Sequence, residues 1–148
     1  MQIIEMRKSR ANSDEIPSVI LSSLPYRLLE EIRRRSGGER IEEIRLRRDR
    51  RASLTLSGRN LVLDTILEGS EIDATLTGMC SGSLYAYSDT INNGYISLPS
   101  GVRVGVCGKA SCEGERMIGV HEISSLVIRI PHKARRVGEP VRRLLPSE

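Results

Sequence analysis

The eleven residues GVRVGVCGKAS, Gly101–Ser111, are compatible with two different structures, a phosphate-binding loop or a β-strand. The phosphate-binding loop of ATPases follows G-x-x-x-x-G-K-[ST], in which backbone N–H groups and the lysine bind phosphate and the hydroxyl binds magnesium. Gly108 and Lys109 match this pattern, but Arg103 occupies the position of the first glycine and Ala110 that of the hydroxyl. Both mismatches fall on residues that the chemistry requires, so we exclude a nucleotide site here.

The same segment alternates apolar with small or polar side chains, and this period of two predicts a half-buried β-strand. The apolar positions are Val102, Val104 and Val106, and the alternating positions are Arg103, Gly105 and Cys107. Neighbouring segments that also predict strands are YISL at 95–98, ERMIGVHE at 115–122 and SSLVIRI at 124–130. Turns of only a few residues join these segments, and such short turns connect antiparallel strands.

A helix is predicted near the start of the chain by SSLPYRLLEEIRRRSGG at 22–38. Leu28, Leu29 and Ile32 lie on one face of this helix, which has about three turns. We expect Ser23 to be its N-cap, and the pair Gly37-Gly38 to end it after an arginine-rich last turn.

The remaining segments complete an α+β pattern. IEEIRLR at 41–47 predicts a strand, and RASLTLSGRNLVL at 51–63 predicts a hairpin. Apolar residues at helical spacing in 70–91, interrupted by glycines, predict two helices with a break between them or one kinked helix. We therefore expect an α+β fold in which a small group of strands and a three- or four-stranded antiparallel sheet are covered on one face by helices.

The chain divides into three regions by composition. Its 148 residues, 39% of them hydrophobic, are sufficient for one domain with one core. We expect residues 1–15 to be a mobile arm because they are polar and lack periodicity, and residues 16–131 to form the α+β domain. Residues 132–148 are basic and contain prolines, which is typical of a linker leading to another domain.

The distribution of charge limits the choice of partners. Residues 1–51 carry 13 Lys and Arg against 9 Asp and Glu, residues 129–143 carry 6 against 1, and residues 52–128 carry 4 against 8. Basic flanks suit nucleic acid, anionic lipid, or the phosphates and acidic surface of a neighbouring domain. With four Tyr and neither Trp nor Phe, the chain lacks aromatic residues for stacking bases, which disfavours nucleic acid.

Cysteine and histidine spacing predicts no metal site. Cys80, Cys107 and Cys112 form no C-x-x-C pair, and His121 and His132 complete no zinc pattern. Cys107 with His121 could be read as a nucleophile and its base, although the sequence provides no geometry for such a pair. An odd number of cysteines, with neither a signal-peptide core nor an apolar run of about 18 residues, predicts a cytoplasmic protein.

Three blocks together resemble a known family: IEEIRLR at 41–47, SLYAYSDTINNGYISLPSGVRVGVCGKA at 83–110 and EISSLVIRI at 122–130. From Leu24 to its end, the chain resembles the N-terminal region of the stage III sporulation protein AA family, cytoplasmic ATPases related to those of type II secretion and type IV pili. Residues 99–102, PSGV, depart from the two glycines and following histidine or similar residue that are usual in the family.

The resemblance implies an N-terminal regulatory and assembly domain of a sporulation ATPase, with the fold of the N-terminal domain of secretion ATPases. In the family a P-loop ATPase core follows, whereas residues 1–148 contain neither a Walker A nor a Walker B motif, so this chain alone is not expected to be an enzyme. The resemblance implies ATP and magnesium as cofactors of the full-length protein only. The implied partners are its own ATPase domain, the neighbouring subunits of a hexamer and membrane proteins of a secretion-like complex in the mother cell.

The same resemblance suggests a role for three arginines. In the related ATPases this domain lies over the nucleotide and can contribute arginines to its phosphates. Arg47, Arg103 and Arg129 each lie on a predicted strand, so they are candidate contacts to phosphate or to a neighbouring subunit. Alternatively, each arginine pairs with a glutamate on the strand surface, at Glu42, Glu43 or Glu122. A stand-alone nucleic-acid-binding module that uses residues 45–51 and 129–143 is the alternative function.

Overall fold

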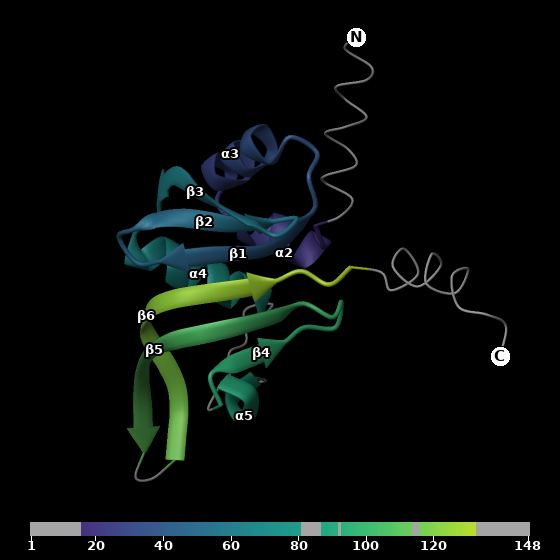
Figure 1. Cartoon of the computed structure of the whole chain (residues 1–148). Helices are drawn as coiled ribbons and strands as arrows, with labels where there is room; N and C mark the ends of the chain where they lie inside the picture. The colour runs from purple at the N-terminus through teal and green to yellow at the C-terminus, as the bar shows by residue number, and fades with distance from the viewer. Residues whose placement is uncertain (1–15, 81–86, 92, 114–115, 133–148) are drawn as a thin grey trace, which may run out of the picture.

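The computed structural model describes residues 16–80, 87–91, 93–113 and 116–132. Figure 1 shows the elements in these ranges. The helices are α2 (Ser18–Ser23), α3 (Tyr26–Ser36), α4 (Gly69–Met79) and α5 (Ser88–Ile91). The strands are β1 (Ile41–Arg47), β2 (Arg51–Leu56), β3 (Arg59–Ile66), β4 (Tyr95–Ser97), β5 (Arg103–Glu113) and β6 (Arg116–Arg129).

The strands form one antiparallel six-stranded sheet in the order β3-β2-β1-β6-β5-β4, so the predicted α+β fold is confirmed. The predicted hairpin and the predicted later sheet are therefore two halves of a single sheet. They meet where β1 pairs with β6, for example at Ile44 opposite Ile128 and Leu46 opposite Leu126. All four of these side chains are fully buried, and this contact unites the two halves through a common core.

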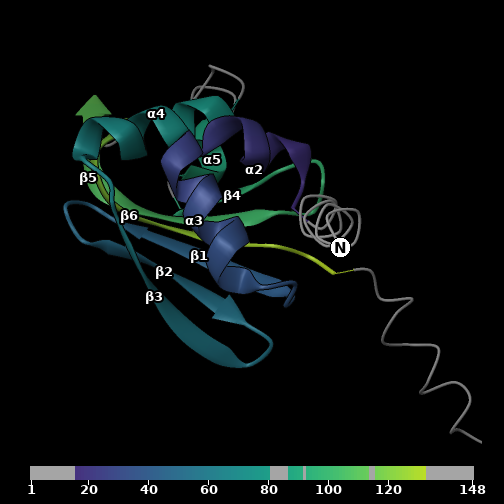
Figure 2. The same ribbon diagram turned by 90° about the horizontal axis from the view of Figure 1, so that it is seen from above.

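All the described helices lie on one face of the sheet, as Figure 2 shows from above. The alternation within each strand directs one set of side chains toward these helices. On β5 this set is Val102, just before the strand, with Val104 and Val106, all of them buried as predicted. The core is aliphatic, since its large fully buried side chains are Leu, Ile and Met. Among the described residues, no helix covers the opposite face, which we call the open face.

The predicted start of the first helix is wrong. Ser23 is the last residue of α2, and its hydroxyl donates to the carbonyl of Val19 at 2.5 Å. The residue that caps α3 is Pro25, whose carbonyl accepts from the N–H groups of Leu28 and Leu29. A residue before proline prefers extended backbone, and Leu24 therefore separates the two helices. The predicted end is confirmed, because Gly37 adopts the left-handed conformation as C-cap.

The predicted pair of strands at the end of the sheet is one continuous strand, β6. The break that we expected near Glu122 is instead a local irregularity, with φ of 49° at Glu122 and a register shift between Cys107 and Lys109. The carboxylate of Asp73 on α4 accepts from the N–H of Ile123 at 3.3 Å, which fixes the strand beside this irregularity. A bulge therefore replaces the predicted turn and lets the ladder continue.

Several predictions fall on residues beyond the described ranges. The predicted arm at 1–15 and almost all of the predicted linker at 132–148 lie outside them, as does the centre of the turn at 113–115. Between 70 and 91 the described residues form two separate helices, α4 and α5, as one of the two alternatives predicted. None of the described helices is both long enough and apolar enough to cross a membrane.

Candidate functional site

Two rows of side chains run across the open face, because directly paired residues of antiparallel strands point to the same side. The first row, from β3 to β4, is Asn60, Thr55, Glu43, Arg129, Arg103 and Ser97. The second row is Val62, Ser53, Arg45, Val127, Gly105 and Tyr95. The central strands therefore place several arginines beside one another on a surface without a covering helix.

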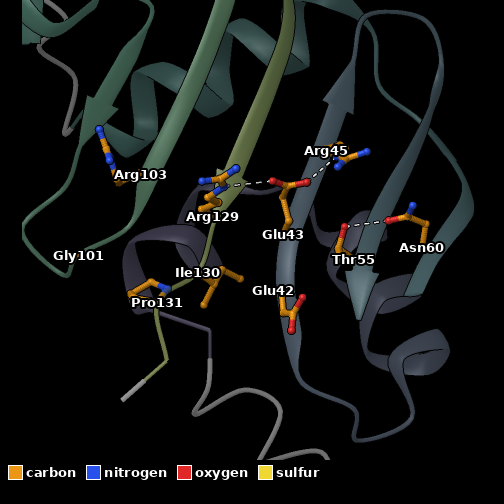
Figure 3. Close-up of a pocket in the computed structure, with 10 residues that line it drawn as sticks. All are labelled: Glu42, Glu43, Arg45, Thr55, Asn60, Gly101, Arg103, Arg129, Ile130 and Pro131. Atoms are coloured by element: carbon orange, nitrogen blue, oxygen red, sulfur yellow. Dashed lines mark hydrogen bonds and ion pairs between the residues drawn. The ribbon is translucent and has the colours of Figure 1, made fainter. Parts of the chain in front are cut away.

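Glu43 is the anion at the centre of this surface. Its carboxylate accepts from Nε of Arg45 at 2.5 Å and from Nε of Arg129 at 3.4 Å, as the dashed lines in Figure 3 show. The Glu43 side chain is 10% exposed, whereas Arg129 is 75% exposed and Arg45 38% exposed. One carboxylate held at the base thus orients two guanidinium groups that reach toward solvent.

Arg103 lies directly opposite Arg129 in the register of β5 and β6. Like charges at directly opposed positions repel, since their Cα atoms are only about 5 Å apart. The two side chains diverge: the Arg103 guanidinium lies 5.1 Å from the centre of the Tyr95 ring, whereas Arg129 turns to Glu43. Figure 3 shows the Arg103 side chain pointing away from β6 and the Arg129 side chain pointing toward Glu43. Each guanidinium therefore keeps an exposed surface for an additional anion.

A shallow hollow of about 500 Å³ lies in front of these residues. Figure 3 shows its lining, which is Glu42, Glu43, Arg45, Thr55, Asn60, Gly101, Arg103, Arg129, Ile130 and Pro131. We call it the Arg129 hollow. Gly101 has φ of +87°, which favours glycine, and a Cβ added there would lie 3.4 Å from Cγ of Pro131. The turn before β5 and the end of β6 thus form one wall together.

Arg47 is on the same open face, but it is separated from the other two predicted arginines. It pairs with Ser125, four residues along β1 from the Glu43–Arg129 pair, which corresponds to roughly 13 Å along the strand. A smaller hollow along β1 and β6 is lined by both Arg47 and Arg129. Of the three predicted site residues, Arg103 and Arg129 are therefore directly opposed in register, whereas Arg47 lies farther along β1 and shares only the smaller hollow with Arg129.

The glutamate alternative holds in part. Arg129 pairs with Glu43, as the alternative predicted, but among the described residues no glutamate pairs with Arg47 or Arg103. Glu122 pairs instead with Lys109 at 2.7 Å. Arg45 was not among the three arginines predicted to contact phosphate or a neighbouring subunit, and it was named only within the 45–51 segment of the nucleic-acid alternative. The period of two in IEEIRLR places Glu43, Arg45 and Arg47 on one face, and this signal could have identified it.

The arrangement suits the binding of anions. In the described part of the chain, no group of three or more His, Cys, Asp or Glu side chains could hold a metal ion. In the backbone register Cys107 pairs with Ser125, whereas His121 pairs with Lys109, so Cys107 and His121 are not opposed positions of the ladder. Guanidinium groups carry a permanent charge and bind phosphate or carboxylate with paired hydrogen bonds.

Fold and surface together define an α+β domain whose open sheet face presents arginines. The sequence also matches a known family: residues 10–147 match the family described as "Sporulation stage III, protein AA". The chain belongs to the sporulation stage III protein AA family.

Two known proteins show how far the similarity extends. Stage III sporulation protein AA of Bacillus subtilis (strain 168) is 28% identical over 101 residues, which are 68% of this chain and 33% of that protein. The chain thus spans about a third of the length of this relative. Among solved structures, it is similar to the VirB11 ATPase from the Brucella suis type IV secretion system, with a TM-score of 0.42 and 15% identity over 88% of this chain and 38% of that chain.

Proposed function

We propose that the chain is the N-terminal regulatory and assembly domain of a sporulation ATPase of the secretion type. In this proposal Arg103 and Arg129 contact the phosphates of a nucleotide bound by the adjoining ATPase domain, or an acidic surface of the neighbouring subunit. Closure of this domain over the nucleotide would couple ATP hydrolysis to the membrane proteins of a secretion-like complex. Membership of the sporulation stage III protein AA family supports the proposal.

The observation that carries the proposal is the direct opposition of Arg103 and Arg129 on adjacent strands. Two like charges at paired positions destabilise a sheet unless an opposite charge lies close to them. A phosphate in front of the two strands would accept from both guanidinium groups once they turn from Tyr95 and Glu43 toward each other, and it would replace this repulsion with two charge-assisted contacts. The open face leaves room for such a ligand, because no described helix covers it and the Arg129 hollow lies beside both arginines.

The test uses the complete protein, isolated from its own cells with natural termini. Its intact mass is measured first, because a mass near this chain's 16.5 kDa would leave no ATPase domain and overturn the proposal. ATP hydrolysis and oligomeric state are then compared for wild type, Arg103→Ala and Arg129→Ala. We expect KM for ATP to rise or kcat to fall by about tenfold in each variant, as for other lost charged contacts to phosphate.

Arg34→Ala is the matched control, since Arg34 is an exposed arginine of α3 on the helix-covered side of the sheet. Its kinetic constants should stay within about twofold of wild type, as for most surface substitutions away from a site. Unchanged kinetics and unchanged assembly in both Arg103→Ala and Arg129→Ala would overturn the proposal.

A nucleic-acid-binding module is the second candidate, and the gathering of arginines on one open face favours it. Two features weigh against it: Glu43 already neutralises part of the charge, and Arg103 covers Tyr95. The two candidates differ in salt dependence. Binding to nucleic acid should weaken linearly on a log–log plot against salt, with a slope set by the number of phosphates contacted, so a chain that binds no DNA or RNA at low salt excludes this candidate.

A further inference from the structure

A third hollow on the open face combines exposed aliphatic side chains with arginines. It lies on the side of β1 toward β2 and β3, away from Arg103 and Arg129. Val62 and Ile66 of β3 line it, and they are 51% and 49% exposed. We call it the Val62 hollow. Large aliphatic side chains are usually buried. Two of them on one rim therefore mark a surface whose burial against a partner would be favourable.

The charge around these aliphatic residues is strongly positive. The lining includes Arg45, Arg47, Arg50 and Arg51, and a single carboxylate, Asp49. Arg51 is partly neutralised, because it pairs with the exposed carboxylate of Asp64 at 2.7 Å. Arg47 and Arg50 have no ion pair among the described residues. A partner for this surface must therefore carry negative charge as well as apolar side chains.

The partner cannot bind by adding a strand along the second half of β3. The N–H groups of Asp64 and Thr65 donate to the Glu31 carboxylate at 2.7 and 2.8 Å. The carbonyls of Leu63 and Ile66 accept from Arg51 at 2.7 Å and from Arg27 at 2.8 Å. Side chains thus occupy the backbone groups that a new strand would need. Native sheets commonly block their edge strands against added strands. Contact must instead be made through side chains laid across the open face.

We propose that the Val62 hollow binds an acidic amphipathic helix of a partner protein. Val62 and Ile66 lie opposite Ser53 and Arg51 on either side of a register shift in β3, so they are closer together than the roughly 13 Å of four residues in a regular strand. The apolar stripe of a helix covers this span within about two and a half turns. Apolar side chains of the helix contact Val62 and Ile66, while its carboxylates contact Arg47 and Arg50. An anionic membrane would also attract the arginines, but a bilayer is flat and a hollow suits a helix better.

The inference is independent of the proposed function, since it uses neither Arg103 nor Arg129. Its probe is a labelled synthetic peptide of about four helical turns, with leucines at i, i+4, i+7 and i+11 and glutamates between them. A scrambled peptide of the same composition keeps the charge but has no apolar stripe. Fluorescence anisotropy measures the Kd of each peptide for the 148-residue chain. The ordered peptide should bind at least about fivefold more tightly than the scrambled one.

Three variants locate the binding surface. The double variant Val62→Thr with Ile66→Thr keeps β-branched residues on β3, and it should raise Kd about tenfold, as should Arg47→Glu. Arg34→Glu makes the same charge change on the helix-covered side of the sheet, and it should leave Kd within about twofold. Arg103→Ala should also bind the peptide normally, which separates this test from that of the proposed function.

Other results would overturn the inference. Equal binding of the ordered and scrambled peptides would indicate attraction by charge alone. Binding of phosphatidylserine vesicles that is lost in the double variant, without peptide binding, would assign the surface to a membrane. Self-association of the chain that disappears in the double variant would assign it to a second copy. Unchanged peptide binding in the double variant and in Arg47→Glu would place the contact elsewhere.

Discussion

The carboxylate of Glu43 on β1 lies 3.4 Å from Nε of Arg129 on β6, a contact between residues 86 positions apart in the chain. The pair forms where the two halves of the sheet meet. Its two members differ in environment, because the Glu43 side chain is 10% exposed and Arg129 is 75% exposed. An ion pair with one solvated member is weak, so Arg129 can exchange Glu43 for an external anion at little cost.

Removing the charge of Glu43 should therefore strengthen anion binding at the Arg129 hollow. In Glu43→Gln the amide keeps the shape of the side chain, while the local repulsion of an incoming phosphate disappears. We expect the Kd of inorganic tripolyphosphate, measured by calorimetry at low salt, to fall about threefold or more. Glu30→Gln is the matched control, because Glu30 is exposed on α3 at the helix-covered side. A Kd that is equal in both variants, or that rises in Glu43→Gln, would contradict the role assigned to Glu43.

Local sequence patterns predicted the individual elements but could not predict how the two halves of the sheet join. Alternation in Ile41–Arg47 and around Val104 identified which side chains share a face. It says nothing about which strands are neighbours, because the pairing of β1 with β6 depends on the burial of Ile44 and Ile128 against a common core. Such distant pairings are set by tertiary packing rather than by local propensity.

The site shows the same division between local and distant information. Arg103 and Arg129 were predicted to lie on strands, and they do. Their direct opposition depends on the register of β5 and β6, which the strand patterns do not predict. This register also changes along the ladder, because it shifts at a bulge between Cys107 and Lys109. The bridging position of Glu43 requires β1 to be next to β6. Arg47 was predicted as a candidate contact, as were Arg103 and Arg129. It is separated from them because it lies four residues farther along β1 than Glu43, the residue opposite Arg129.

Glu31 should be the most sensitive polar residue of the core. Its side chain is 5% exposed and accepts from the N–H groups of Asp64 and Thr65 and from the Thr65 hydroxyl. Burial alone would raise the pKa of this carboxyl, but these hydrogen bonds and Arg35 hold the pKa below its usual range. Glu31→Ala leaves two backbone donors without their partner, so we expect it to lower the free energy of unfolding by about 2–4 kcal/mol in urea titrations.

The neighbouring residue provides the control for this prediction. Glu30→Ala removes an exposed carboxylate from the same turn of α3, and it should change the free energy of unfolding by less than about 0.5 kcal/mol. Similar losses in the two variants would show that Glu31 acts through helix propensity or net charge rather than by holding β3.

Acid should weaken the contact between α3 and α4. Arg27 pairs with Glu71, and its hydrogen bonds, with one from the N–H of Glu68, lower the pKa of Glu71 to about 2. A lowered pKa means that the contribution to stability is complete above the unfolded value of about 4.3 and is lost as the pH falls toward 2. Arg27→Gln should therefore cost about 1 kcal/mol or less at pH 7 and nearly nothing at pH 2.

The measurement is the difference in the free energy of unfolding between wild type and Arg27→Gln across this pH range. A constant difference from pH 7 to pH 2 would attribute the loss to the hydrogen bond from Arg27 to the carbonyl of Ile66, which does not titrate. A difference that grows as the pH falls would contradict the sign derived from the lowered pKa of Glu71.

The reactivity of the cysteine thiols measures how accessible the open face and the core are to a reagent. Cys107 is exposed and shares a row with Arg47 and Ser125, whereas Cys80 is buried in the core. Burial raises the pKa of the Cys80 thiol to about 11, so only about one in a thousand of these thiols is ionised at pH 8. In a Cys112→Ser background, Ellman's reagent should therefore modify one thiol quickly and the second about a hundredfold more slowly. Denaturant should release the slow thiol.

The fast reaction also tests whether an anion occupies the surface that these arginines form. Cys107 lies four residues along the sheet from the Arg103–Arg129 pair, so tripolyphosphate bound near Arg129 would repel the negatively charged reagent at low salt, and we expect the rate to fall as the ligand saturates. Arg129→Ala should remove this protection, while Arg34→Ala, which makes the same change on the helix-covered side, should retain it. Protection that persists in Arg129→Ala would place the anion elsewhere on the open face. Two fast thiols would show that Cys80 is accessible and would contradict the packing of α4 against the sheet.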